Sequence, residues 1–219
     1  MFVRQLMGTV ALMALAAAAH ASPTFNFNTG AQGVTAGTGG VVQWRSSGGI
    51  GNTGYIDVTD YTPGETYLIA PVSGNLSSLL GGTLSFSYNS TGQRRTNAYV
   101  PYDAFGTVRI YSGASFVEAD LIAPIVSDIM GTGWHTTSAY SLLDSAWTGS
   151  GLLSSILANV TMVTIVSEYN NTVVWPDEII GFDNIAFAPS ATTVPEPASG
   201  ALLIAGLLGA GLVARRKRR

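Results

Sequence analysis

The chain has 219 residues, no cysteine and a formal charge of −3, and only 11% of its residues are charged. The absence of cysteine excludes a disulfide scaffold and any cysteine-based metal or redox site. Six of the ten basic residues lie at the two ends of the chain, so the region between them is acidic. An acidic body repels phosphate backbones, which argues against nucleic-acid binding.

The first 21 residues have the organisation of a secretory signal peptide. Arg4 precedes an apolar run over residues 6–19, and Ala19 and Ala21 form an A-x-A cleavage site. We therefore expect removal of residues 1–21, with cleavage before Ser22. The alternative is a permanent N-terminal anchor, which the short, alanine-rich run disfavours.

Residues 24–187 carry many short runs that alternate apolar and polar side chains, separated by glycine-rich turns. Alternation with a period of two is typical of strands with one buried face. This pattern predicts one all-β domain, an antiparallel β-sandwich. Only residues 72–80 and 151–157 have a helical pattern. The expected strands are residues 55–58, 67–70, 84–88, 108–111, 116–122, 160–168 and 179–187.

The last of these strands contains an acid among large apolar residues. Strict alternation would place Asp183 on the same face as Ile185 and Phe187, opposite Phe182 and Asn184. A carboxylate in such surroundings has to be hydrogen-bonded, paired with a cation or bound to a metal.

Catalytic motifs are scarce in the body. His135 is the only histidine between the two ends, no G-x-S-x-G motif is present, and no phosphate-binding loop fits. A single histidine also argues against zinc hydrolysis. Glycoside hydrolysis needs only two carboxylates, so a hydrolase remains the alternative. Its candidate acids are Asp57, Asp60, Glu65, Glu118, Asp120, Asp128, Glu168, Asp177, Glu178 and Asp183.

Two kinds of ligand site are compatible with the composition. No cofactor is expected other than a structural calcium ion, which prefers oxygen ligands. Asp57 with Asp60, and Asp177 and Asp183 together with Glu178, could each supply its ligands. Sugars pack their C–H faces on aromatic rings, and Trp44, Trp134 and Trp147 lie in turn-rich segments that would suit such contacts. The same tryptophans would also serve as plugs that seal the ends of a sandwich.

The C-terminal segment has three parts. After a linker at residues 188–194 come Pro195, Glu196 and Pro197, then an apolar run at residues 198–214 that is long enough for a transmembrane helix. Five basic residues follow, Arg215, Arg216, Lys217, Arg218 and Arg219, which act as a stop-transfer signal and stay in the cytoplasm. The expected topology is body outside, basic tail inside.

This order of Pro-Glu-Pro, apolar helix and basic tail resembles the PEP-CTERM sorting signal of Gram-negative bacteria that make exopolysaccharide. The resemblance implies that an exosortase, a membrane protease, recognises residues 195–197 and removes the helix and tail. The inner membrane would then hold the precursor only transiently, and the product would reach the cell surface or extracellular matrix.

A second resemblance covers most of the body. The segments "GGIGNTGYIDVTD" (48–60), "GNLSSLLGGTLSFSY" (74–88), "LSSILANVTMVTIVSE" (153–168) and "GFDNI" (181–185) are similar to those of laminin B (laminin IV type A) domains. This resemblance implies a jelly-roll β-sandwich without catalytic residues. The expected function is a non-enzymatic surface or matrix protein that associates with exopolysaccharide. The alternatives are a polysaccharide hydrolase and an anchored surface protein with no glycan ligand.

Overall fold

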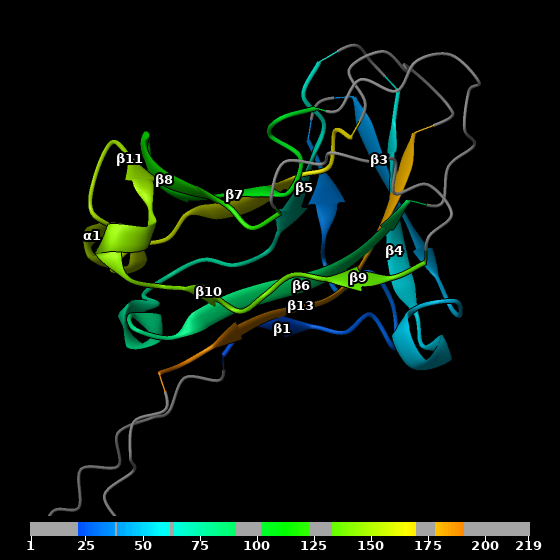
Figure 1. The fold of residues 1–219 in the computed structure, drawn as a ribbon, viewed down its shortest axis with the longest axis horizontal. Helices are drawn as coiled ribbons and strands as arrows, with labels where there is room; N and C mark the ends of the chain where they lie inside the picture. Colours follow the sequence, from blue (N-terminus) through cyan, green and yellow to red (C-terminus); the bar gives the residue numbers. More distant parts are fainter. Residues whose placement is uncertain are drawn as a thin grey trace, which may run out of the picture.

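The body is a sandwich of two antiparallel β-sheets (Figure 1). The computed structural model describes residues 22–37, 39–61, 64–90, 102–122, 133–169 and 178–190. Within these ranges, sheet A has seven strands and sheet B has six. The all-β sandwich predicted from the alternating pattern is confirmed.

Sheet A is organised around its last strand in the sequence. Its order is β10 (Tyr140–Ser141), β6 (Thr83–Ser90), β13 (Ile179–Ala188), β4 (Tyr55–Asp60) and β3 (Gly40–Arg45). In addition, β1 (Thr24–Phe25) pairs with β13, and β9 (His135–Thr136) pairs with β6. The strand β13 therefore contacts β6 along one edge and both β4 and β1 along the other.

Sheet B lies across the core from sheet A. Its order is β11 (Thr148–Gly149), β8 (Ser115–Asp120), β7 (Thr107–Ser112), β12 (Met162–Val166), β5 (Tyr67–Ala70) and β2 (Thr35–Ala36). The two longest strands of this sheet, β7 and β8, form a hairpin that pairs from Thr107 with Asp120 to Ser112 with Ser115.

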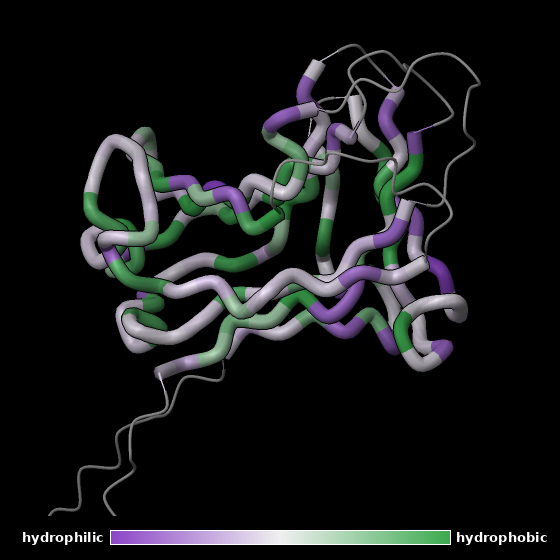
Figure 2. The backbone as a smooth tube through the Cα atoms, in the orientation of Figure 1, coloured by the Kyte–Doolittle hydropathy of each residue, from purple (hydrophilic) through white to green (hydrophobic). Residues whose placement is uncertain are grey.

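The core fills the space between the sheets, and hydrophobic residues recur among polar ones along the strands on both sides of it (Figure 2). Fully buried side chains come from both sheets, and burying each of them stabilises the fold by about 1.5–3 kcal/mol before entropy is counted. The largest are Phe27, Phe86, Phe182, Phe187, Ile56, Leu68, Leu84, Ile110, Leu142, Leu153, Leu157 and Ile165.

Helical structure is sparse among the described residues. The helix α1 (Leu153–Leu157) falls within the predicted residues 151–157, and Leu153, Ile156 and Leu157 are buried. The predicted helical segment at 72–80 has only a 3-10 turn, η2 (Ser77–Leu79). The rest of that segment is not helical, because Gly74 and Val160 exchange two backbone hydrogen bonds of 2.8 Å, as residues paired in a sheet do.

A β-bulge in β13 overturns the predicted alternation around Asp183. Phe182 lies opposite Tyr88 and Phe187 lies opposite Leu84. Tyr88 and Leu84 are four residues apart on β6 and so share a face, which places Phe182 and Phe187 together in the core. Asn184, with a φ of 50°, is the extra residue that makes this possible. Asp183 therefore lies on the opposite face, outside the core.

The first and last described strands pair with each other, Thr24 with Ala186 and Phe25 with Ile185. The described part of the chain therefore begins and ends on the same side of the sandwich (Figure 1). No helix within the described ranges is long and apolar enough to cross a membrane. The expected signal peptide and the expected transmembrane helix at residues 198–214 lie outside these ranges.

Candidate functional site

The outer face of sheet A carries a pair of aromatic rings over a bare patch of backbone. The rings of Trp134 and Tyr55 meet in an edge-to-face arrangement, with a centroid distance of 5.3 Å and an interplanar angle of 82°. The ring of Trp134 is also fixed by a hydrogen bond of 2.8 Å, which its Nε1 donates to the carbonyl of Gly48. Gly181 lies beneath both rings, where a Cβ would come within 3.2 Å of each. The rings can rest on the sheet only because residue 181 has no side chain.

Polar groups flank this aromatic pair on β3 and β4. Gln43 lies opposite Asp57 and Arg45 lies opposite Tyr55, so all four side chains share the outer face. Arg45 Nε donates to Asp57 Oδ2 at 2.7 Å, and the Asp57 side chain is only 4% exposed, against 42% for Arg45. The hydrogen bond to Asp57 raises the pKa of Arg45. Asp57, a predicted calcium ligand, is instead the partner of an arginine.

Asp183 lies on the same outer face and accepts hydrogen bonds from a glycine-rich loop. Its Oδ2 accepts the backbone N–H of Ile50 at 2.9 Å, and its Oδ1 accepts its neighbour's N–H, that of Asn184, at 2.7 Å. Thr53 Oγ1 lies 3.5 Å from Oδ2. The loop can approach this closely because residue 49 is a glycine, whose Cβ would lie 2.8 Å from Asp183 Oδ2. Burial raises the pKa of Asp183, and these hydrogen bonds oppose the rise.

The other two predicted tryptophans each donate a hydrogen bond to a backbone carbonyl. Trp44 is 38% exposed, and its Nε1 donates to the carbonyl of Phe27 at 2.7 Å, which ties β3 to the segment after β1. Trp147 is only 6% exposed, donates to the carbonyl of Ser141 at 2.9 Å and meets Tyr140 edge-on. Trp147 is therefore a plug at the end of the sandwich, and its ring presents no open face to a ligand.

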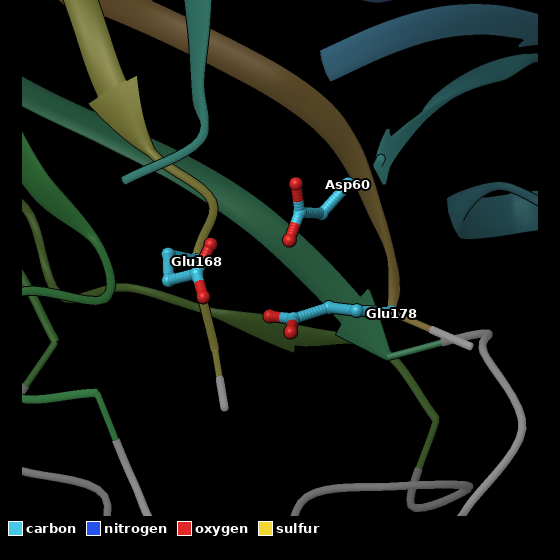
Figure 3. Close-up of side chains that lie close together, drawn as sticks. All are labelled: Asp60, Glu168 and Glu178. Carbon is cyan, nitrogen blue, oxygen red and sulfur yellow. The ribbon is translucent and has the colours of Figure 1, made fainter. Parts of the chain in front are cut away.

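Three acids from both sheets meet inside one end of the sandwich (Figure 3). Asp60 ends β4, Glu168 lies two residues beyond β12, and Glu178 directly precedes β13. One carboxylate oxygen of each lies within 4.8 Å of those of the other two. Their exposures are 2%, 5% and 5%, respectively. We call this group the acid cluster.

The backbone around the acid cluster is tightly fixed. The N–H of Asp60 bonds to the carbonyl of Glu178 at 3.1 Å, and the N–H of Glu168 bonds to that of Thr66 at 3.1 Å. Thr66 Oγ1 also donates to Asp60 Oδ1 at 2.8 Å. Glu178 Oε1 accepts the N–H of Tyr169. The three acids are therefore held in place by both sheets.

Glu168 has a raised pKa. Burial, and then the neighbouring charge of Asp60, raise its pKa to about 7. Its Oε2 is buried and accepts no hydrogen bond from the described residues. The nearby Arg109 binds Glu65 and Glu118 instead, with a 2.9 Å bond from its Nε to Glu118 Oε2.

The three predicted calcium ligands within the described ranges, Asp57, Asp60 and Asp183, do not come together as a group. Asp57 and Asp60 are three residues apart on one strand and so face opposite sides of sheet A. Asp183 lies on the outer face, and only Asp60 belongs to the acid cluster. Glu178 was grouped with Asp177 and Asp183 as a possible source of calcium ligands, whereas Glu168 was not among the predicted ligands. Each directly flanks a buried β run, "TIVSE" or "EIIGF", and this position was the available signal.

Several predicted site residues lie outside the described ranges. They are the cleavage-site residues Ala19 and Ala21, the calcium candidate Asp177, the sorting residues Pro195, Glu196 and Pro197, and the basic tail Arg215, Arg216, Lys217, Arg218 and Arg219. The single histidine of the body, His135, stacks on Tyr88 at a centroid distance of 5.4 Å, in a packing position.

Sequence comparison identifies the C-terminal segment. Residues 193–219 match the family model of the PEP-CTERM protein-sorting motif. This motif indicates export and sorting through a membrane-anchored signal that an exosortase processes. No curated protein matches the chain.

Comparison with solved structures identifies the fold of the body. An exo-beta-agarase matches with a TM-score of 0.51 and 10% identity over 77% of this chain and 25% of its own. The L4b domain of human laminin alpha-2 matches with a TM-score of 0.42 and 10% identity, over 61% of this chain and 79% of its own. A xylan-binding domain from Paenibacillus barcinonensis matches with a TM-score of 0.48 and 12% identity, over 78% of this chain and 95% of its own.

At these identities the structural matches concern the fold alone, and of these three the agarase has a TM-score above 0.5. The sorting signal predicted from Pro195, Glu196, Pro197 and the segment that follows is confirmed by the family match. The chain is thus a β-sandwich that carries a PEP-CTERM protein-sorting motif at its C-terminus.

Proposed function

We propose that this chain is the precursor of a non-enzymatic surface or matrix protein that associates with exopolysaccharide through the outer face of sheet A. An exosortase-type protease would release the body from the inner membrane by cutting near Pro195–Pro197. The observation that carries the glycan assignment is the pair of Trp134 and Tyr55 over Gly181, beside the Arg45–Asp57 ion pair.

The chemistry of this face supports a sugar ligand. Carbohydrates are bound by aromatic rings that pack on their C–H faces, together with a few fixed polar groups that bond their hydroxyls. Trp134 is held by its bond to Gly48, and Arg45 is held by Asp57, so the face is ordered before any ligand arrives. Preorganisation lowers the entropy cost of binding.

The hydrolase alternative has weaker geometric support. The three acids that lie closest together are only 2–5% exposed, which leaves no room for a sugar ring between them. Asp57 and Asp183 are likewise buried and engaged by Arg45 and by the loop at Ile50. The non-enzymatic proposal therefore agrees better with the surroundings of these five acids.

Binding of residues 22–190 to exopolysaccharide from the producing strain tests the proposal. Trp134→Ala should weaken binding at least about tenfold, equivalent to about 1.4 kcal/mol, because it removes the larger ring of the pair. The matched control is Tyr111→Ala, which removes one ring of a pair on sheet B, Tyr111 and Phe116, at 5.7 Å. It should leave binding unchanged.

Each outcome of this experiment is decisive only for protein that is folded, so every variant is first checked for a cooperative unfolding transition. Absence of binding by the folded wild-type body would contradict the glycan proposal. Equal losses for Trp134→Ala and Tyr111→Ala would contradict the assignment to sheet A. Intact-mass analysis of the product in the native host tests processing, because retention of Arg219 would indicate a permanent anchor.

A further inference from the structure

The acid cluster concentrates negative charge in a place where water is excluded. Three carboxylates within 4.8 Å of one another cannot all be ionised in a buried site without a compensating cation. Asp60 accepts a hydrogen bond from Thr66, and Glu178 accepts one from the backbone N–H of Tyr169. The carboxylate of Glu168 faces those of Asp60 and Glu178 (Figure 3), and its buried Oε2 accepts no hydrogen bond from the described residues.

We propose that Asp60, Glu168 and Glu178 bind a calcium ion that ties the two sheets together. The ion would bridge the ends of β4 and β13 in sheet A to the end of β12 in sheet B. Its two positive charges would offset the carboxylates, and the unbonded oxygen of Glu168 would become a ligand.

The chemistry of the cluster selects calcium among common metal ions. All three ligands offer carboxylate oxygens, which suit hard cations, whereas zinc prefers nitrogen and sulfur. Calcium–oxygen bonds are about 2.3–2.6 Å long, so two oxygens on one ion can be up to about 5 Å apart. The separations in the cluster fit that limit. Magnesium keeps several of its waters, which this enclosed site has little room to hold.

The position of the site indicates a structural role. The three acids are 2–5% exposed, so a ligand larger than an ion does not reach them. Calcium would stabilise the folded state by binding it and not the unfolded chain. This role is independent of the glycan-binding face, because Trp134 and Tyr55 lie on the outer side of sheet A.

Calcium titration of the full chain, purified in detergent and freed of metal, tests the proposal. We expect saturable binding by calorimetry, with a Kd near the 10⁻⁴–10⁻³ M range of extracellular modules, and a rise of several degrees in Tm at saturation. Magnesium should give a smaller rise. In Glu168→Gln the Kd should be weaker by at least about tenfold. The matched control is Glu118→Gln, an acid on the face of sheet B that pairs with Arg109, which should bind calcium as the wild type does.

Three results would overturn the proposal. The first is a wild type that neither binds calcium nor gains in Tm, and the second is a calcium response that Glu168→Gln and Asp60→Asn leave intact. The third concerns Arg94 and Arg95, the two arginines of the body that lie outside the described ranges. A stability loss in the double variant Arg94→Ala, Arg95→Ala, without any calcium response, would assign charge compensation to an arginine. None of these results bears on glycan binding.

Discussion

Asp183 and Glu168 are both buried carboxylates, but their surroundings differ in kind. Asp183 is met by the N–H groups of Ile50 and Asn184, supplied by a loop that folds over it. Glu168 is met by two further acids, Asp60 and Glu178. Burial raises the pKa of both groups, and at Asp183 hydrogen bonds oppose the rise, whereas at Glu168 the charge of Asp60 adds to it.

Asp183 fixes the position of a loop through hydrogen bonds, whereas Glu168 has an oxygen that accepts no hydrogen bond from the described residues. Backbone N–H groups aimed at Asp183 stabilise its charged form and, in return, hold the loop at residues 48–54 under Trp134. No such donors meet Glu168 Oε2 among the described residues. Removing charge should therefore have opposite consequences at the two positions, which the following predictions test.

The largest expected effect is a pH dependence of the calcium-free fold that comes from Glu168. Its pKa is about 7 in the folded chain and near 4.5 in the unfolded chain, so between these values the folded state binds more protons. The free energy of unfolding should therefore fall as pH rises from about 4.5 to 7, by about 3 kcal/mol in total. Urea unfolding at pH 5 and pH 7.5 in calcium-free buffer measures this.

The same titration of Glu168→Gln isolates this contribution, because the variant keeps every other titratable group, including Asp60, Glu178 and Glu65. Its pH dependence over this range should be flatter by the amount assigned to Glu168. Parallel curves for wild type and variant would show that Glu168 does not titrate in this range.

A smaller effect of about 2 kcal/mol is expected for Asp183→Asn. An asparagine offers one acceptor oxygen in place of two, so the N–H of Ile50 or that of Asn184 loses its partner. Urea unfolding at neutral pH should show a lower free energy of unfolding. Asp103→Asn, at an exposed position, is the control and should change it by less than about 0.5 kcal/mol. A stabilised Asp183→Asn would refute the structural role given to this carboxylate.

The smallest effect, a gain of about 1 kcal/mol, is expected for Glu168→Gln at pH 7.5 without calcium. The substitution removes one of three neighbouring charges and supplies an N–H₂ group that can donate hydrogen bonds to the other two carboxylates. Denaturant midpoints measured side by side with Asp183→Asn give the comparison directly. Losses of the same sign and size at both positions would mean that the two carboxylates have equivalent roles.

The fold was predictable wherever one face of a strand is buried. Runs such as Leu84, Phe86 and Tyr88 alternate cleanly, and β6 lies where the alternation places it. The strand β3 was missed because it lies at the edge of sheet A and is mostly exposed, so its residues "GVVQWR" show no alternation. The bulge at Asn184 was missed because it depends on pairing with both β6 and β1, which the local sequence does not encode.

The sites were predictable only in part, for a related reason. The sorting motif is a contiguous segment, and the sequence alone sufficed to identify it. The acid cluster joins residues 60, 168 and 178, which lie at or next to the ends of three strands in two sheets. Spacing within one strand suggested Asp57 as a partner of Asp60, although the strand turns them to opposite faces. Which acids lie close together depends on the pairing of strands that are distant in the sequence.

The place of β13 in sheet A has a consequence for folding during export. This strand pairs with β6, β4 and β1, yet it ends at Ala188, just before the sorting motif that begins at residue 193. Sheet A therefore cannot close until nearly the whole body has been translocated, and slow non-local strand pairing has to wait for the last segment. A C-terminal helix that pauses in the membrane would keep this central strand close to its partners while they assemble, so that release follows folding.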